Sequence, residues 1–171
     1  KEREAIKGPS GIPSKEPLVY QVHMNWLNAN TSIQIESSEQ QSHYFSYWRA
    51  DMISHTYKKL TYKNVYDHID IEYIIPTDKE QGIKYTVILH PGADPSKIKI
   101  AYTGDVQKIK LNDAGDVIIK TPLEDLTEHA PLSFYDAKSP VKSAFVITNN
   151  ELSFQFPESY DATRTLYVDP W

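Results

Sequence analysis

The alternation of apolar and charged residues between Ile69 and Ile75 constrains the fold of this chain more than any other feature of it. Isoleucine or tyrosine occupies every second position, and the carboxylates of Asp70 and Glu72 fall between them. A period of two residues is that of a β-strand, whose side chains point alternately to the two faces of a sheet. We therefore predict a strand over residues 69–75, with one apolar face in the core and the carboxylates on the other face.

The segments that follow repeat this pattern between turn signals. Residues 83–89 are rich in the β-branched and aromatic residues that suit a pleated sheet, and apolar residues alternate again over residues 98–102. Asp94 precedes Pro95 as an N-cap precedes a proline at the first helical position, so one short helical turn is expected there. The predicted core includes Ile71, Tyr73, Val87, Leu89 and Ile100.

Strand and turn signals recur at short spacing through the rest of the chain, and no helical apolar period longer than a turn or two is present. Turns, loops or irregular segments are expected at residues 36–42, 52–55, 112–115 and 149–150. The pattern predicts an all-β fold, a mostly antiparallel sandwich of short strands with at most one or two helical turns. We expect a single β-sandwich-like domain over residues 18–171, after a flexible linker or arm over residues 1–17.

The composition excludes several classes of function. The chain has 171 residues and a net charge of −5, whereas surfaces that bind nucleic acid need clustered Lys and Arg. It contains no run of eighteen apolar residues, so we expect no insertion into a membrane. The absence of cysteine excludes disulfides, thiolate metal sites and cysteine nucleophiles.

Several spaced motifs resemble a known bacterial family. They occur in order at residues 62–70, 91–98, 112–116 and 160–170, with weaker matches at residues 28–30 and 44–45. The chain resembles the N-terminal β-rich domain (DUF7948-like) of large secreted and cell-surface proteins, mainly of Bacteroidota. Those proteins often continue into SBBP-type β-propeller or PKD-type repeats, and some end in a gliding-motility or type IX secretion tail. Asp67-His68 replaces the Pro-Gly usual in the family, which leaves open how the chain turns before Ile69.

The resemblance implies a non-catalytic module located outside the cell or on its outer surface. Such a module would serve adhesion, gliding motility or surface assembly. It would present or cap downstream repeats of the same polypeptide and contact other surface proteins. The resemblance also favours a structural role for Asp70.

His68, Asp70 and Glu72 alternate in the sequence, so their side chains could project together from one strand. An imidazole with two carboxylates could bind a divalent metal or act as paired acids. The alternative is that they form the solvent face of an amphipathic strand, with Lys84 or another base opposite. We favour the solvent face, and we expect no metal and no cofactor.

Asp94, Asp113 and Asp116 are candidate calcium ligands, but they lack the dense Asp-x-Asp-x-Asp spacing of calcium loops. A cap for Asp94 and a turn for the other two are simpler roles. The chain has no Gly-x-Ser-x-Gly or His-Glu-x-x-His motif. We therefore expect no enzyme, and a hydrolase with acids around Asp70 and Glu72 is the least favoured function.

Tyr44, Tyr47 and Trp48 belong to an aromatic cluster with two interpretations. Exposed rings could form a platform that stacks on sugar rings or on the apolar anchors of a partner. Alternate residues of a strand point inward, so the cluster could instead be half core and half rim. We favour the core, and keep a carbohydrate-binding module as the alternative function.

The C-terminal motif at residues 160–170 is expected to close the sheet. Asp161 is placed to accept hydrogen bonds from the turn that follows it, and Asp169 marks the end of the last strand. Arg164 could hold a carboxylate or loop carbonyls as a partly buried latch. Leu166 and Val168 are predicted to point into the core, with Tyr167 outward.

Overall fold

The computed structural model describes residues 18–47, 52–76, 82, 84–135 and 139–170. The linker expected over residues 1–17, and Trp48 of the aromatic cluster, lie outside the described residues. Strands make up 58% of the chain and helix 2%, in antiparallel sheets, so the predicted all-β sandwich is confirmed. The helical part is one 3-10 turn, η1, at Pro95–Lys97, with Asp94 as its N-cap.

The largest sheet has seven strands and carries most of the predicted core. Its order is β11 (Pro140–Val141), β10 (Leu132–Tyr135), β14 (Leu166–Asp169), β5 (Lys84–Leu89), β4 (Ile69–Ile74), β3 (Met52–Tyr66) and β2 (Gln34–Tyr47). Ile71 lies opposite Val87, which also lies opposite Val168. Residues opposite one another share a face, and all three side chains are fully buried.

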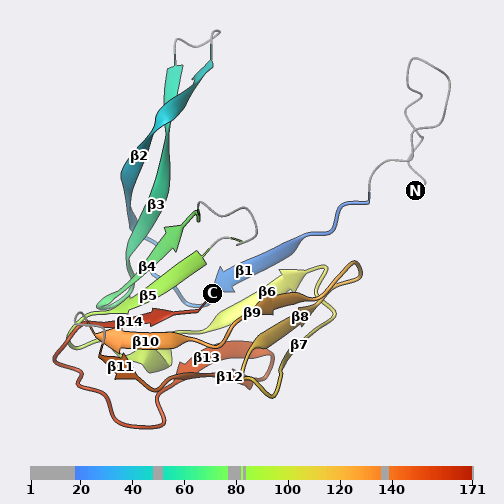
Figure 1. Cartoon of the computed structure of the whole chain (residues 1–171), viewed down its shortest axis with the longest axis vertical. Helices are drawn as coiled ribbons and strands as arrows, with labels where there is room; N and C mark the ends of the chain where they lie inside the picture. The colour runs from blue at the N-terminus through green and yellow to red at the C-terminus, as the bar shows by residue number, and fades with distance from the viewer. Residues whose placement is uncertain (1–17, 48–51, 77–81, 83, 136–138, 171) are drawn as a thin grey trace.

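Two smaller sheets complete the described part of the chain (Figure 1). The four-stranded sheet has the order β1 (Val22–Trp26), β6 (Ile100–Gly104), β13 (Glu151–Gln155) and β12 (Ala144–Thr148). The three-stranded sheet has the order β7 (Lys108–Leu111), β8 (Val117–Lys120) and β9 (Leu126–Glu128). One cluster of buried side chains draws on all three sheets, including Ile71, Ile100 and Val117.

The core predictions are confirmed for four of the five residues. Ile71, Val87 and Ile100 are fully buried, and Leu89 is 1% exposed. Tyr73 lies at the edge of the predicted core, since it is partly buried and packs against the core cluster. Its hydroxyl accepts a hydrogen bond from Trp26 Nε1 at 2.7 Å, which keeps the polar end of the ring at the core's margin.

The hairpin turns follow from residues that tolerate the left-handed region. Asn149 and Asn150 have φ of 52° and 64°, and a type I′ turn requires positive φ at both central residues. Gly115 has φ of 85° in the turn before β8. His68 has φ of 62° and lies with Asp67 in the turn between β3 and β4. This turn therefore forms without the Pro-Gly pair of the family pattern.

The loop predicted at residues 36–42 and the irregular segment at 52–55 are wrong. Both belong to a long hairpin of β2 and β3 that rises clear of the rest of the domain (Figure 1). The last ladder pair between β3 and β4 joins Lys59 to Ile74. Nearly all of β2 is exposed. Because neither face of the strand packs on the core, apolar residues do not recur at every second position, and the strand cannot be recognised from such a pattern. We call residues 36–47 and 52–58 the projecting hairpin.

Candidate functional site

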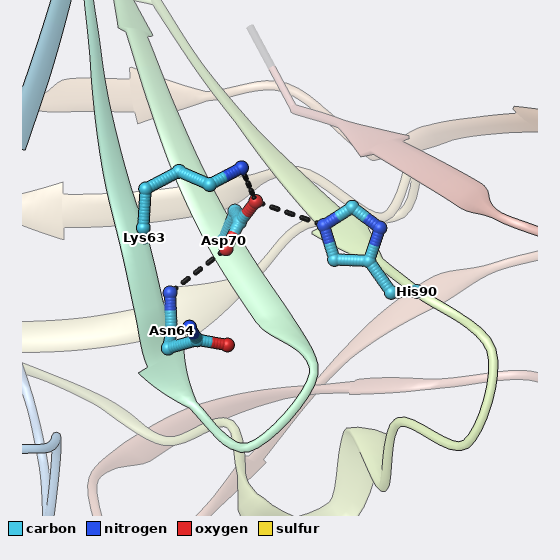
Figure 2. Close-up of polar contacts among 4 residues, drawn as sticks. All are labelled: Lys63, Asn64, Asp70 and His90. Carbon is cyan, nitrogen blue, oxygen red and sulfur yellow. Dashed lines mark hydrogen bonds and ion pairs between the residues drawn. The ribbon is translucent and has the colours of Figure 1, made fainter. Parts of the chain in front are cut away.

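Asp70 lies in β4 at the centre of a buried polar cluster (Figure 2). Its side chain is 2% exposed, so the solvent face predicted for it is wrong. Asp70 Oδ2 forms an ion pair with Lys63 and lies 2.8 Å from His90 Nε2. Asp70 Oδ1 accepts a hydrogen bond from the backbone N–H of Asn64 at 2.8 Å. The side chains of Lys63 and His90 cover the carboxylate that the sequence pattern placed toward solvent.

A bulge in β3 explains why a backbone N–H of this strand donates to the Asp70 side chain. The register between β3 and β4 shifts between Tyr62 and Tyr66, and Asn64 within this shift has φ of 52°. A bulge leaves backbone groups without a ladder partner and redirects the chain. The Asp70 carboxylate accepts the Asn64 N–H where the ladder is interrupted.

The charges of the cluster favour an ionised Asp70. Burial raises the pKa of its carboxyl group, but hydrogen bonds from Lys63, Asn64 and His90 together outweigh burial and lower the pKa. The hydrogen bond to Asp70 raises the pKa of Lys63. His68, predicted to share a strand face with Asp70 and Glu72, lies in the preceding turn, and Glu72 pairs with Lys59 at 3.2 Å. The three residues do not form one metal or acid–base site.

The cluster braces the loops around it. The backbone N–H of His90 donates to His68 O at 2.9 Å. His90 therefore contacts Asp70 through its side chain and the β3–β4 turn through its backbone. Both oxygens of the Asp70 carboxylate accept bonds from other residues of the domain. A general base must come within hydrogen-bond reach of a substrate proton, whereas this carboxylate is 2% exposed. The geometry therefore favours a structural role for Asp70.

A cleft of about 570 Å³ adjoins the Asp70 cluster and is lined in part by Asn64. Its lining comes from three segments that are far apart in the sequence, at residues 28–30, 64–68 and 92–97. The first two segments are bonded to one another, since the backbone N–H of Asn30 donates to Val65 O at 2.8 Å and Asn30 Nδ2 donates to Asn64 O at 2.7 Å. The Tyr66 hydroxyl donates to Leu27 O at 2.8 Å. Hydrogen bonds therefore hold two of the three lining segments of the cleft together.

The aromatic cluster is on the projecting hairpin, and its predicted burial is wrong. Tyr44 and Phe45 are each 58% exposed, Tyr47 is 51% exposed, and Ile53 on the facing strand is 59% exposed. Tyr44 and Tyr47 are three residues apart in β2, so their side chains point to opposite faces. They do not form a single flat platform for a sugar ring. Trp48, the third predicted member, lies outside the described residues.

The remaining predicted acids have local structural contacts. Asp94 Oδ1 accepts the Ser96 N–H at 3.0 Å, and Asp161 Oδ1 accepts the Thr163 N–H at 3.0 Å. Asp116 Oδ1 accepts the Ala130 N–H at 2.9 Å. Neighbouring hydrogen-bond donors lower the pKa of the Asp94, Asp116 and Asp161 carboxyl groups. In the described part of the chain, Asp113 belongs to no group of three or more His, Cys, Asp or Glu residues that could hold a metal ion, and no such group occurs.

The C-terminal motif differs in part from its prediction. Leu166 and Val168 are fully buried, as predicted. Asp169 pairs with Lys84 at 2.8 Å, so Lys84 is not the base opposite Asp70 and Glu72. Lys63 and Lys59 of β3 are the bases that pair with them. Arg164 is exposed, and its guanidinium carbon lies 4.1 Å from the centre of the Tyr135 ring. The partial burial predicted for Arg164 is therefore wrong, and its guanidinium lies against an aromatic ring of β10.

Sequence reasoning missed a second, partly buried polar cluster at Glu128. The hydroxyls of Tyr85 in β5 and Tyr102 in β6 each donate to one oxygen of this carboxylate in β9. Burial raises the pKa of Glu128 more than the two tyrosine hydrogen bonds lower it. The contact joins one residue from each of the three sheets. No local signal predicts it, because the three residues lie in separate strands.

The model of one family, Domain of unknown function (DUF7948), matches residues 3–171. The chain belongs to this family. The match includes both strands of the projecting hairpin, the Asp70 cluster and every segment that lines the cleft. No curated protein and no solved structure matches the chain. Among the described residues of this DUF7948 domain, no helix is long and apolar enough to cross a membrane.

Proposed function

We propose that this DUF7948 domain is a non-catalytic binding module of a bacterial secreted or cell-surface protein, and that it contacts a partner protein through the projecting hairpin. The exposed apolar residues of that hairpin are the observation on which the proposal rests. Tyr44, Phe45, Tyr47 and Ile53 are all more than half exposed within two strands. Clusters of exposed aromatic and aliphatic side chains are typical of protein interaction sites.

The backbone of the hairpin also suits a partner. β2 is the edge strand of the seven-stranded sheet, and an edge strand offers unpaired N–H and C=O groups to an incoming strand. Pairing with such an edge is a common way for a protein to bind an extended segment of another. The apolar residues on both faces of the hairpin would then pack against the partner's side chains.

The resemblance to large surface proteins of Bacteroidota supplies the setting of the proposal. In that setting the domain presents or caps downstream repeats, outside the cell, in adhesion, gliding motility or surface assembly. The hairpin reaches away from the body of the domain (Figure 1), as a contact to a separate protein requires. The opposed faces of Tyr44 and Tyr47 give less support to a carbohydrate platform, and the buried, paired Asp70 carboxylate gives less support to a hydrolase.

Site-specific photo-cross-linking in cells that express the full parent protein tests this proposal. A photoreactive residue at Phe45 should form a cross-link to one defined partner, and the same residue at the exposed Lys110 of β7 should not. Ile53→Ser on the facing strand should weaken the Phe45 cross-link. Protease added to intact cells should remove the domain if it is surface-exposed. A Phe45 position that forms no cross-link beyond the Lys110 background would overturn the proposed contact.

A further inference from the structure

The cleft beside the Asp70 cluster has the size of a small-ligand site, and hydrogen bonds order part of its lining. Its volume of about 570 Å³ falls within the range of about 300–1,000 Å³ usual for ligand pockets. Hydrogen bonds join its first two segments, at residues 28–30 and 64–68. A site that is already ordered loses little conformational entropy when a ligand binds.

Residues of the Asp70 cluster form hydrogen bonds to two residues that line the cleft. The Asp70 carboxylate holds the backbone N–H of Asn64, and His90 holds the carbonyl oxygen of His68. Asn64 and His68 both line the cleft and both have positive φ. Hydrogen bonds with residues of this cluster therefore hold two lining residues in a backbone conformation that L-residues rarely adopt.

The lining is rich in neutral groups that both donate and accept hydrogen bonds. Asn28 and Asn64 are exposed, and their side chains have no hydrogen-bond partner among the described residues. An asparagine amide offers two N–H donors and one carbonyl acceptor. A sugar hydroxyl group also donates and accepts, so amides of this kind match a hydroxyl-rich ligand.

The charges around the cleft do not favour a strongly charged ligand. Lys97 contributes one positive charge to the lining, and Asp67 and Asp94 contribute two negative charges. Asp94 Oδ1 already accepts bonds from the backbone N–H and the hydroxyl of Ser96. Phosphate sites use several convergent cations, and calcium sites use six to eight oxygen ligands. A neutral ligand fits this mixed lining better than either ion.

We propose that this cleft binds the neutral, hydroxyl-rich end of a glycan through the side-chain amides of Asn28 and Asn64. The site is separate from the projecting hairpin, because none of its lining residues belongs to the hairpin. A glycan would be held by hydrogen bonds at the cleft and a partner protein by apolar contacts at the hairpin.

Nuclear magnetic resonance titration of the ¹⁵N-labelled domain tests this site directly. The probes are glucose, galactose, mannose, rhamnose, fucose and N-acetylglucosamine, each added alone at millimolar concentration. We expect at least one sugar to shift the side-chain amide signals of Asn28 and Asn64, with a saturable response. Calcium chloride and sodium phosphate, added alone, should leave these signals in place.

Glycine substitutions separate the side-chain role from the backbone role. Asn28 and Asn64 have φ of 57° and 52°, a region that glycine adopts freely, so Asn28→Gly and Asn64→Gly remove the amides without straining the loops. The double variant should bind the sugar at least tenfold more weakly. Asn149→Gly is the matched control, since Asn149 also has φ of 52° and lies in the β12–β13 turn. It should bind as the unmodified domain does.

Three outcomes would overturn the proposal. The first is that none of the six sugars shifts the two amide signals. The second is that the double variant binds a sugar as tightly as the Asn149→Gly control. The third is that calcium or phosphate, and no sugar, gives a saturable shift at the cleft. Each result leaves the hairpin contact untouched, because cross-linking at Phe45 tests that surface independently.

Discussion

Removing the Asp70 carboxylate should destabilise the domain strongly, because this charge is both buried and paired. The side chain is 2% exposed and holds Lys63, His90 and the Asn64 N–H. Breaking a buried ion pair by removing one partner costs about 3–5 kcal/mol. The side chains of Lys63 and His90 are 33% and 37% exposed, so they recover some hydration. We expect Asp70→Ala to cost about 3 kcal/mol, the lower end of that range.

Asp70→Asn separates the charge from the shape. The amide oxygen can still accept the Asn64 N–H, but the ion pair with Lys63 is lost. Hydrogen bonds to charged groups contribute about 1.5–3 kcal/mol each, so this variant should lose about 2 kcal/mol, less than Asp70→Ala. Asp67→Asn, in the exposed turn nearby, is the control and should stay within about 0.5 kcal/mol of the unmodified domain.

Urea unfolding followed by circular dichroism measures these differences. With a denaturant slope of about 1–3 kcal/mol/M for small proteins, the midpoint for Asp70→Ala should fall by about 1 M or more. The folded state holds the pKa of Asp70 below its ordinary value. Its stabilisation is therefore present above the unfolded pKa, and is lost as the pH falls through the folded pKa. Asp70→Asn should show a smaller loss of stability in acid. A shift below about 0.5 kcal/mol for Asp70→Ala, as at a surface site, would refute the buried ion pair.

Three further predictions concern stability. Glu128 has a higher pKa in the folded domain than in the unfolded chain, so the domain should lose stability as the pH rises from the unfolded pKa through the folded pKa. Glu128→Gln should remove this loss, and urea titrations at several pH values measure it. Ile71→Ala should cost about 2–5 kcal/mol in the same assay, since the side chain is fully buried, and a loss typical of surface sites would show that the strand faces are inverted. Arg164→Ala should cost at least the ~0.5–1 kcal/mol of an exposed cation–π contact, and an unchanged free energy of unfolding would show that this contact does not stabilise the domain.

The sequence predicts those parts of the fold in which one face of a strand is buried. Ile69 and Ile71 alternate with Asp70 and Glu72, and both isoleucines are fully buried on one face of β4. The projecting hairpin has no buried face along most of β2, so residues 36–42 show no period and resemble a loop. Strand structure there depends on pairing with β3, which a local pattern does not contain.

The candidate sites were less predictable because they depend on contacts between residues far apart in the sequence. A buried Asp70 and an exposed one give the same alternating pattern, and the difference depends on Lys63 and His90, which cover it. The cleft combines segments more than twenty residues apart in the sequence, at 28–30, 64–68 and 92–97. The asparagines of these segments are recognisable as turn residues, but their convergence comes only from the sheet topology.

The affinity of the partner captured at Phe45 tests the central claim most directly. The purified partner should be titrated with the unmodified domain, with Phe45→Ser and with Ile53→Ser, which remove apolar side chains from opposite faces of the hairpin. Leu132→Ser is the matched control, since Leu132 is 61% exposed on β10, away from the hairpin. We predict that each hairpin variant binds about tenfold or more weakly, which corresponds to about 1.4 kcal/mol, and that Leu132→Ser binds normally. Equal affinity for the hairpin variants and the unmodified domain would contradict the claim that the hairpin is the contact surface.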